Sequence, residues 1–98
     1  MVNVLVACGS GLVTSAIVEN ELYTIAENNG VKIKITKVGM TSIDSWIRQN
    51  ELLVSTSKYQ GDTYGIPSLA GNSLLSGIGK EEFETEFIAT VKEIEAAN

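Results

Sequence analysis

The sequence predicts an α/β domain built on an open parallel sheet, and three observations indicate it. A nearly continuous apolar run at Val2 to Ala7 ends in a glycine-rich turn, which is typical of a strand buried on both faces. Further strand-like segments alternate with segments whose apolar residues recur at helical spacing. The chain has 98 residues, enough for one hydrophobic core. We therefore expect a single domain over residues 1–98.

The first half of the chain predicts two strands and two helices in alternation. After the first strand, apolar residues at helical spacing predict a helix that ends near Gly30, a typical C-terminal cap. Apolar residues alternating with lysines over 31–36 predict a second strand, and its lysines suit a sheet edge. Residues 41–44 resemble a capping box, and a short helix follows whose apolar face is formed by Ile43, Trp46 and Ile47.

The second half predicts two more strands and a final helix. Leu52 to Ser55 forms the third strand, and residues 57–65 form a surface loop whose conformation the pattern leaves open. Residues 66–70 form a fourth strand, which Pro67 marks as an edge strand because proline lacks an N–H group. The final helix covers the sheet with an apolar stripe of Phe83, Phe87, Val91 and Ile94.

The alternation of strands and helices predicts right-handed crossovers and a Rossmann-like sheet flanked by helices. With the second and fourth strands at the edges, the predicted strand order is 2-1-3-4. The direction of the crossovers then reverses between the first and third strands. Ligands of such sheets bind beyond the carboxyl ends of the strands at this switch point. Cys8, which follows the first strand, is expected there.

Composition excludes several functional classes. The net charge of −5 and the pI of about 4.5 argue against binding to nucleic acid or to an anionic membrane surface. No apolar run approaches the roughly 20 residues of a membrane span, so we expect a cytoplasmic protein. The chain has one cysteine and no histidine, which excludes a Cys/His metal site or a Cys-His catalytic pair within it. We predict no cofactor and no metal.

The loop that starts at Cys8 has the features of an anion site. Gly9 and Gly11 allow a sharp turn that directs successive N–H groups inward, and the following helix presents its positive end to the same point. This field favours a thiolate, so we expect the pKa of the Cys8 thiol to be lowered. The hydroxyls of Thr14 and Ser15 either contact a phosphate oxygen or cap the helix.

The loop contains no arginine, and this absence indicates a phosphoryl carrier. A similar loop in the low-molecular-weight tyrosine phosphatases reads Cys, five residues, Arg, Ser, and the arginine holds the phosphate. Here Thr14 stands at the arginine position, and Asp62 lacks the Asp-Pro pair expected of a general acid. Hydrolysis of a phosphocysteine should therefore be slow.

The loop Cys8-Gly9-Ser10-Gly11-Leu12-Val13-Thr14-Ser15, followed later by Gly65-Ile66-Pro67 and Leu75-Ser76-Gly77-Ile78-Gly79, resembles a known family. It is similar to the enzyme IIB component of the bacterial phosphoenolpyruvate-dependent sugar phosphotransferase system, in particular the galactitol-specific type. The resemblance implies that Cys8 accepts a phosphoryl group from a histidine of enzyme IIA and passes it to a sugar bound by the membrane transporter enzyme IIC. It also implies a phosphate-binding role for Gly9, Ser10, Gly11, Leu12, Val13, Thr14 and Ser15.

Alternatives remain open at this point. One is a cysteine-dependent phosphatase or arsenate reductase, which the missing arginine disfavours. Another is a nucleotide-binding module, which is disfavoured because Thr14 replaces the third glycine and Lys37 stands where an acidic residue would bind a ribose. Lys58 is either a solvated lysine or a residue that assists transfer, and Tyr59 and Tyr64 either pack on the sheet or contact a partner. The sugar is either galactitol, another sugar or ascorbate.

Overall fold

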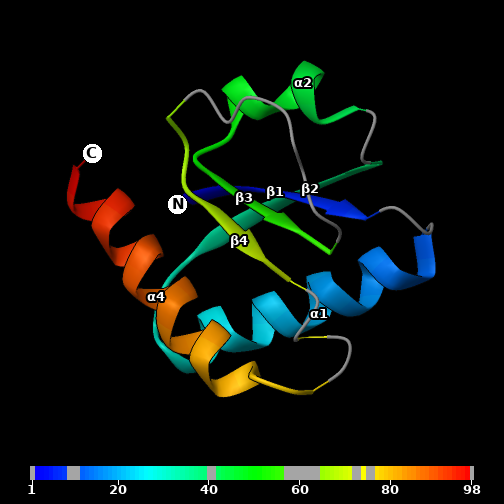
Figure 1. Cartoon of the computed structure of the whole chain (residues 1–98). Helices are drawn as coiled ribbons and strands as arrows, with labels where there is room; N and C mark the ends of the chain where they lie inside the picture. The colour runs from blue at the N-terminus through cyan, green and yellow to red at the C-terminus, as the bar shows by residue number, and fades with distance from the viewer. Residues whose placement is uncertain are drawn as a thin grey trace.

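The structure, a computed structural model, describes residues 2–8, 12–39, 42–56, 65–71, 74 and 77–97. For residues 8 and 12–15 it describes the backbone alone. A four-stranded sheet forms the middle layer, with strand order β2-β1-β3-β4 (Figure 1). The strands are β1 (Val2–Cys8), β2 (Ile33–Gly39), β3 (Leu52–Ser55) and β4 (Ser68–Ala70). All three neighbouring pairs are parallel, so the predicted order and sheet type are confirmed.

Helices cover both faces of this sheet. The long helices α1 (Leu12–Asn28) and α4 (Lys80–Ala97) lie on one face. The short helix α2 (Ile43–Trp46) and the 3₁₀ turn η2 (Ile47–Gln49) lie on the other (Figure 1). Gly30, with φ of +69°, follows α1 in the left-handed conformation expected of a C-terminal cap. No helix in the described part of the chain is long and apolar enough to cross a membrane.

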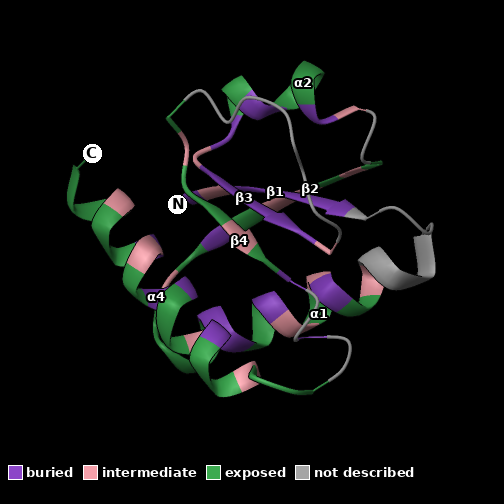
Figure 2. Ribbon diagram, viewed as in Figure 1, coloured by how far each residue is buried: buried purple, intermediate pink, exposed green. Residues whose placement is uncertain are grey.

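The core has two parts because β1 is buried on both faces (Figure 2). Val2, Val4 and Val6 of β1 join the apolar residues of α1 and α4, among them Leu22 and Phe87. Leu5 and Ala7 point to the opposite face, where they pack with Ile43, Ile47 and Leu53. This alternation explains why the first strand reads as a nearly continuous apolar run.

Two strands begin later than the sequence predicts, for identifiable reasons. The N–H of Val31 donates to the carbonyl of Ala26 at 3.0 Å, so Val31 belongs to the turn that ends α1, and β2 begins at Ile33. Pro67 has no N–H to donate, but its carbonyl accepts from the N–H of Leu53 at 2.9 Å. The strand β4 therefore begins only at Ser68.

The short helix also differs from the expectation. Ser42 occupies the N-cap position but makes no side-chain capping hydrogen bond, and Thr41 lies outside the described residues. Ile43 and Ile47 are buried as predicted, but the side chain of Trp46 is 42% exposed. A single helical turn buries a narrow stripe, and Trp46 lies beside that stripe rather than on it. In α4, by contrast, the predicted stripe is buried except for Ile94, which is half-buried.

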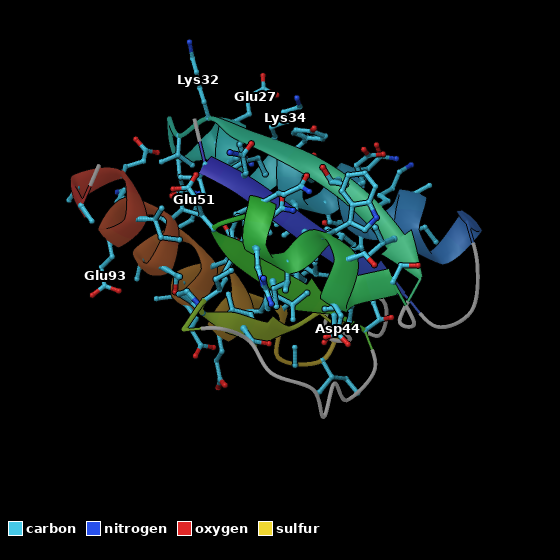
Figure 3. The ribbon with its side chains drawn as sticks, turned by 90° about the horizontal axis from the view of Figure 1, so that it is seen from above. Glu27, Lys32, Lys34, Asp44, Glu51 and Glu93 are labelled. Atoms are coloured by element: carbon cyan, nitrogen blue, oxygen red, sulfur yellow. The ribbon has the colours of Figure 1, made fainter. Side chains whose placement is uncertain are left out.

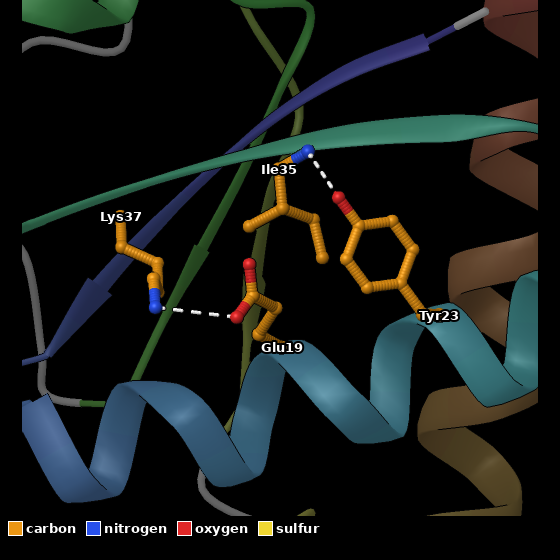
Figure 4. A network of polar contacts seen from close by, with 4 residues as sticks. All are labelled: Glu19, Tyr23, Ile35 and Lys37. Carbon is orange, nitrogen blue, oxygen red and sulfur yellow. Dashed lines mark hydrogen bonds and ion pairs between the residues drawn. The ribbon is translucent and has the colours of Figure 1, made fainter.

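The outer edge of β2 is partly covered by side chains from α1 (Figure 4). The N–H of Ile35 donates to the Tyr23 hydroxyl at 3.2 Å. Next to it, Lys37 Nζ lies 3.2 Å from Glu19 Oε1. These contacts fasten α1 to the edge strand and satisfy a backbone donor that would otherwise be open to pairing with another chain.

We expect Tyr23→Phe to lower the free energy of unfolding by about 1 kcal/mol, because the Ile35 N–H loses its acceptor. Urea denaturation measures this change. Thr24→Val is the control, since the Thr24 hydroxyl donates only to the carbonyl of Asn20 within the same helix. If both variants unfold at the same urea concentration, the edge hydrogen bond contributes nothing to stability.

Candidate functional site

Cys8 is the last residue of the central strand β1, at the carboxyl edge of the sheet. Its backbone pairs with Gly39, the last residue of β2. On the other side, Ala7 pairs with Ser55, the last residue of β3. The chain leaves β1 toward β2 on one side of the sheet and later returns to β3 on the other. The backbone of Cys8 therefore lies at the switch point of the fold, where parallel sheets bind their ligands.

The helix α1 begins at Leu12, four positions after Cys8. Leu12 to Ser15 form its first turn, and this turn contains no acidic residue. The partial positive charge of the helix terminus is therefore not opposed by a carboxylate within that turn. Gly9, Ser10 and Gly11, which were predicted to bind phosphate, lie outside the described residues.

Hydrogen bonds continue the sheet beyond its strands next to Cys8. The N–H of Thr56 donates to the carbonyl of Ala7 at 3.0 Å, and the N–H of Gly71 donates to the carbonyl of Ser55 at 2.7 Å. Ser55 is only 6% exposed. Hydrogen bonds therefore hold the ends of β1, β3 and β4 together at the edge of the sheet where Cys8 lies. The sequence predicts Ser55 as the end of the third strand but assigns neither Ser55 nor Thr56 to the site, although polar residues that end an apolar strand are a visible signal.

The described lysines differ in how near they lie to this edge. Lys32 and Lys34 lie toward the amino end of β2, close to Glu27 in Figure 3 and far from the end of β1 that carries Cys8. Lys37 is opposite Val6, two positions before the Cys8–Gly39 pair. Lys58, Tyr59 and Tyr64 lie outside the described residues, as does Asp62.

The described residues contain no cluster of three or more histidine, cysteine or acidic side chains that could hold a metal ion. Within that part of the chain, the switch point brings together the backbone end of β1 at Cys8 and a helix, α1, that begins four positions later. The amino end of a helix favours a bound oxyanion.

The sequence matches a family model described as "PTS system, Lactose/Cellobiose specific IIB subunit" over residues 3–66. The chain belongs to the IIB family of the sugar phosphotransferase system. The matched region includes β1 from its second residue onward, together with α1, β2, α2 and β3, and hence Cys8 and both strands that flank it. As a IIB protein, the chain is a phosphotransferase component, and the resemblance seen in the sequence is confirmed at this level.

Two curated proteins of Escherichia coli (strain K12) are similar to this IIB chain over nearly its whole length. The first is named "Putative phosphotransferase enzyme IIB component SgcB" and is 29% identical over 89 residues, which cover 91% of this chain and 96% of that protein. The second is named "PTS system galactitol-specific EIIB component" and is 22% identical over 89 residues, which cover 91% of this chain and 95% of that protein.

Proposed function

We propose that Cys8 carries the phosphoryl group of this IIB protein, accepting it from a histidine of enzyme IIA and delivering it to a sugar bound by enzyme IIC. The observation that supports this most is the place of the only cysteine. It ends the central strand at the switch point, four positions before the first residue of α1. The proposal places the chain in the cytoplasm as a single domain over residues 1–98.

The two transfer steps need no further reactant. In the first, the Cys8 thiolate attacks the phosphorus of the phosphohistidine, a P–S bond forms, and the P–N bond breaks with its electron pair left on the imidazole nitrogen. In the second, a sugar hydroxyl attacks the same phosphorus, a P–O bond forms, and the P–S bond breaks. The thiolate is regenerated, and the hydroxyl proton passes to a base. The chain has no histidine, so the donor imidazole belongs to the partner.

The residues after Cys8 stabilise the negative charge of the phosphoryl group in this proposal. In this proposal the backbone N–H groups of Gly9, Ser10, Gly11, Leu12, Val13, Thr14 and Ser15, together with the amino end of α1, bind the phosphoryl oxygens. Thr14 occupies the position where a phosphatase loop has arginine. Without a guanidinium to stabilise the transition state, water attacks the phosphocysteine slowly, and the group persists until the sugar arrives.

We propose galactitol as the sugar. The support is the similarity to the galactitol-specific EIIB component of Escherichia coli (strain K12), at 22% identity, and not a residue of this chain, since the sugar is bound by enzyme IIC. Membrane vesicles that contain the cognate enzyme IIC, supplied with phosphoenolpyruvate and the soluble components, should form galactitol phosphate. Formation of another sugar phosphate in place of galactitol phosphate would show that the substrate is a different sugar. It would leave the proposed role of Cys8 unchanged.

We expect Cys8→Ser to abolish phosphoryl transfer to this chain. The assay combines radiolabelled phosphoenolpyruvate with enzyme I, HPr, enzyme IIA and this protein, and it follows the label bound to each protein. The wild-type chain should take up about one phosphoryl group per molecule, whereas Cys8→Ser should take up none. Thr14→Val, which keeps the thiol but removes a hydroxyl, should still be labelled.

The same preparation distinguishes a carrier from a cysteine phosphatase or arsenate reductase. The isolated wild-type chain should not turn over p-nitrophenyl phosphate, because Thr14 replaces the arginine that hydrolysis requires. Robust turnover by the isolated protein that is lost in Cys8→Ser would show that the thiol performs hydrolysis, and it would overturn the carrier function.

A further inference from the structure

The fold brings one cationic side chain close to the end of β1. Lys37 is opposite Val6, and two positions further along the same pair of strands Gly39 is opposite Cys8. Two residues span about 7 Å along a strand, and neighbouring strands lie about 5 Å apart, so the two Cα atoms are roughly 8 Å apart. The four-carbon stem of a lysine can cover most of that distance.

The ammonium of Lys37 is held on the face of the sheet that α1 covers. Its Nζ atom lies 3.2 Å from Oε1 of Glu19 (Figure 4). Both side chains remain partly exposed, at 35% for Lys37 and 25% for Glu19. An ion pair this exposed is weak, so the lysine can exchange its partner at little cost.

The described residues next to Cys8 along the strands and in the first turn of α1 are uncharged. Val6 and Ala7 precede it, Ser55 and Thr56 end the neighbouring strand, and the first turn of α1 has no acidic residue. Glu19 lies seven positions after Leu12, about 10 Å along the helix, and its negative charge opposes an anion at the helix terminus. Lys37 and Glu19 therefore have opposite effects on any negative charge that Cys8 carries.

We propose that Lys37 stabilises the phosphoryl group carried on Cys8, and that Glu19 competes with this group for the Lys37 ammonium. The inference rests on the proposed function, because it needs a phosphorylated Cys8. A phosphoryl group carries a charge of about −1.5 to −2 near neutral pH, more than the single charge of Glu19. Lys37 thus provides part of the charge compensation that an arginine provides in phosphatase loops, but from a neighbouring strand.

The equilibrium constant for phosphoryl exchange between enzyme IIA and this chain tests the proposal. Labelled protein is equilibrated with IIA, and the ratio of the two phosphoproteins is measured. A ratio at equilibrium does not depend on how fast the partners dock. We expect Lys37→Gln to shift the equilibrium away from Cys8 about threefold to tenfold, and Glu19→Gln to shift it toward Cys8. Lys37→Arg should restore most of the wild-type value.

The expected shifts of the equilibrium in Lys37→Gln and Glu19→Gln have opposite directions, and this difference distinguishes charge stabilisation from a structural role. Both substitutions break the same ion pair, so a loss of structural support would shift the equilibrium in the same direction in both. The matched control is the second ion pair of α1, in which Lys80 Nζ lies 2.7 Å from Glu21 Oε2. Lys80→Gln and Glu21→Gln should change the equilibrium less than about twofold, because Glu21 lies nine positions after Leu12, about 14 Å along α1, where salt screens the field of the pair.

The outcomes of this experiment identify which proposal fails. A labelled wild-type chain with an unchanged equilibrium in Lys37→Gln would overturn the role of Lys37 and leave the carrier function intact. Shifts of the same sign in Lys37→Gln and Glu19→Gln would also overturn it. A wild-type chain that takes no label from enzyme IIA would overturn the carrier function, and the role of Lys37 with it.

Discussion

Phe87→Ala is expected to lower the free energy of unfolding by about 3–5 kcal/mol. The Phe87 side chain is fully buried in the core between the sheet and the helices α1 and α4. Its ring stacks on that of Phe83, with centroids 5.9 Å apart and planes 12° apart. Truncation removes this stacking and leaves a cavity that close-packed neighbours fill only in part. Such a loss is a large fraction of the stability of a domain of this size.

Urea denaturation of Phe87→Ala and of a matched control measures the effect. Ile78→Ala is the control, because it also truncates a large apolar side chain, but one that is 82% exposed. We expect the control to change stability by less than about 0.5 kcal/mol. A loss below about 1 kcal/mol in Phe87→Ala would mean that α4 contributes little to the core.

Gly71→Ala is expected to destabilise the fold by about 1–3 kcal/mol through overpacking. Gly71 is buried directly after β4, and its N–H bonds to the carbonyl of Ser55. A Cβ atom at this position would lie 2.7 Å from Cγ1 of Val54 and 3.6 Å from the carbonyl oxygen of Ser55. Val54 belongs to a central strand and is itself fully buried, so it has little room to move.

Gly39→Ala is the matched control for this substitution. Gly39 is the last residue of β2, at the same edge of the sheet, but a Cβ atom there would meet no atom of the described residues within 4 Å, and its φ is not in the left-handed region. Thermal and urea unfolding should leave Gly39→Ala within about 0.5 kcal/mol of the wild-type chain. Equal stability of the two variants would contradict the tight packing between the ends of β3 and β4.

The strands and their order could be predicted because each left a local signal. Continuous apolar residues marked the central strands, lysines marked β2 as an edge, and Pro67 marked β4 as the other. The exposure of Trp46 could not be predicted in this way. It depends on how few residues α2 contains and on where its single turn lies above the sheet, which are tertiary properties.

The candidate site shows the same division between local and distant information. Cys8 stands out in the sequence because the turn and the helix that surround it are its immediate neighbours. Lys37 does not, because its position relative to Cys8 depends on the register that aligns Val6 with Lys37 across 31 positions of sequence. In the sequence, all cationic residues lie outside the loop. The parallel pairing of β1 with β2 brings one of them, Lys37, close to the end of β1.

The central claim is that Cys8 bears the phosphoryl group, and mapping that group by mass spectrometry tests it most directly. The protein is phosphorylated through enzyme I, HPr and enzyme IIA, digested at a pH that preserves phosphocysteine, and fragmented to locate the added mass. We predict that the phosphoryl group lies on Cys8 and is absent from Cys8→Ser. Phosphate on another residue, or unchanged phosphorylation of Cys8→Ser, would contradict the account.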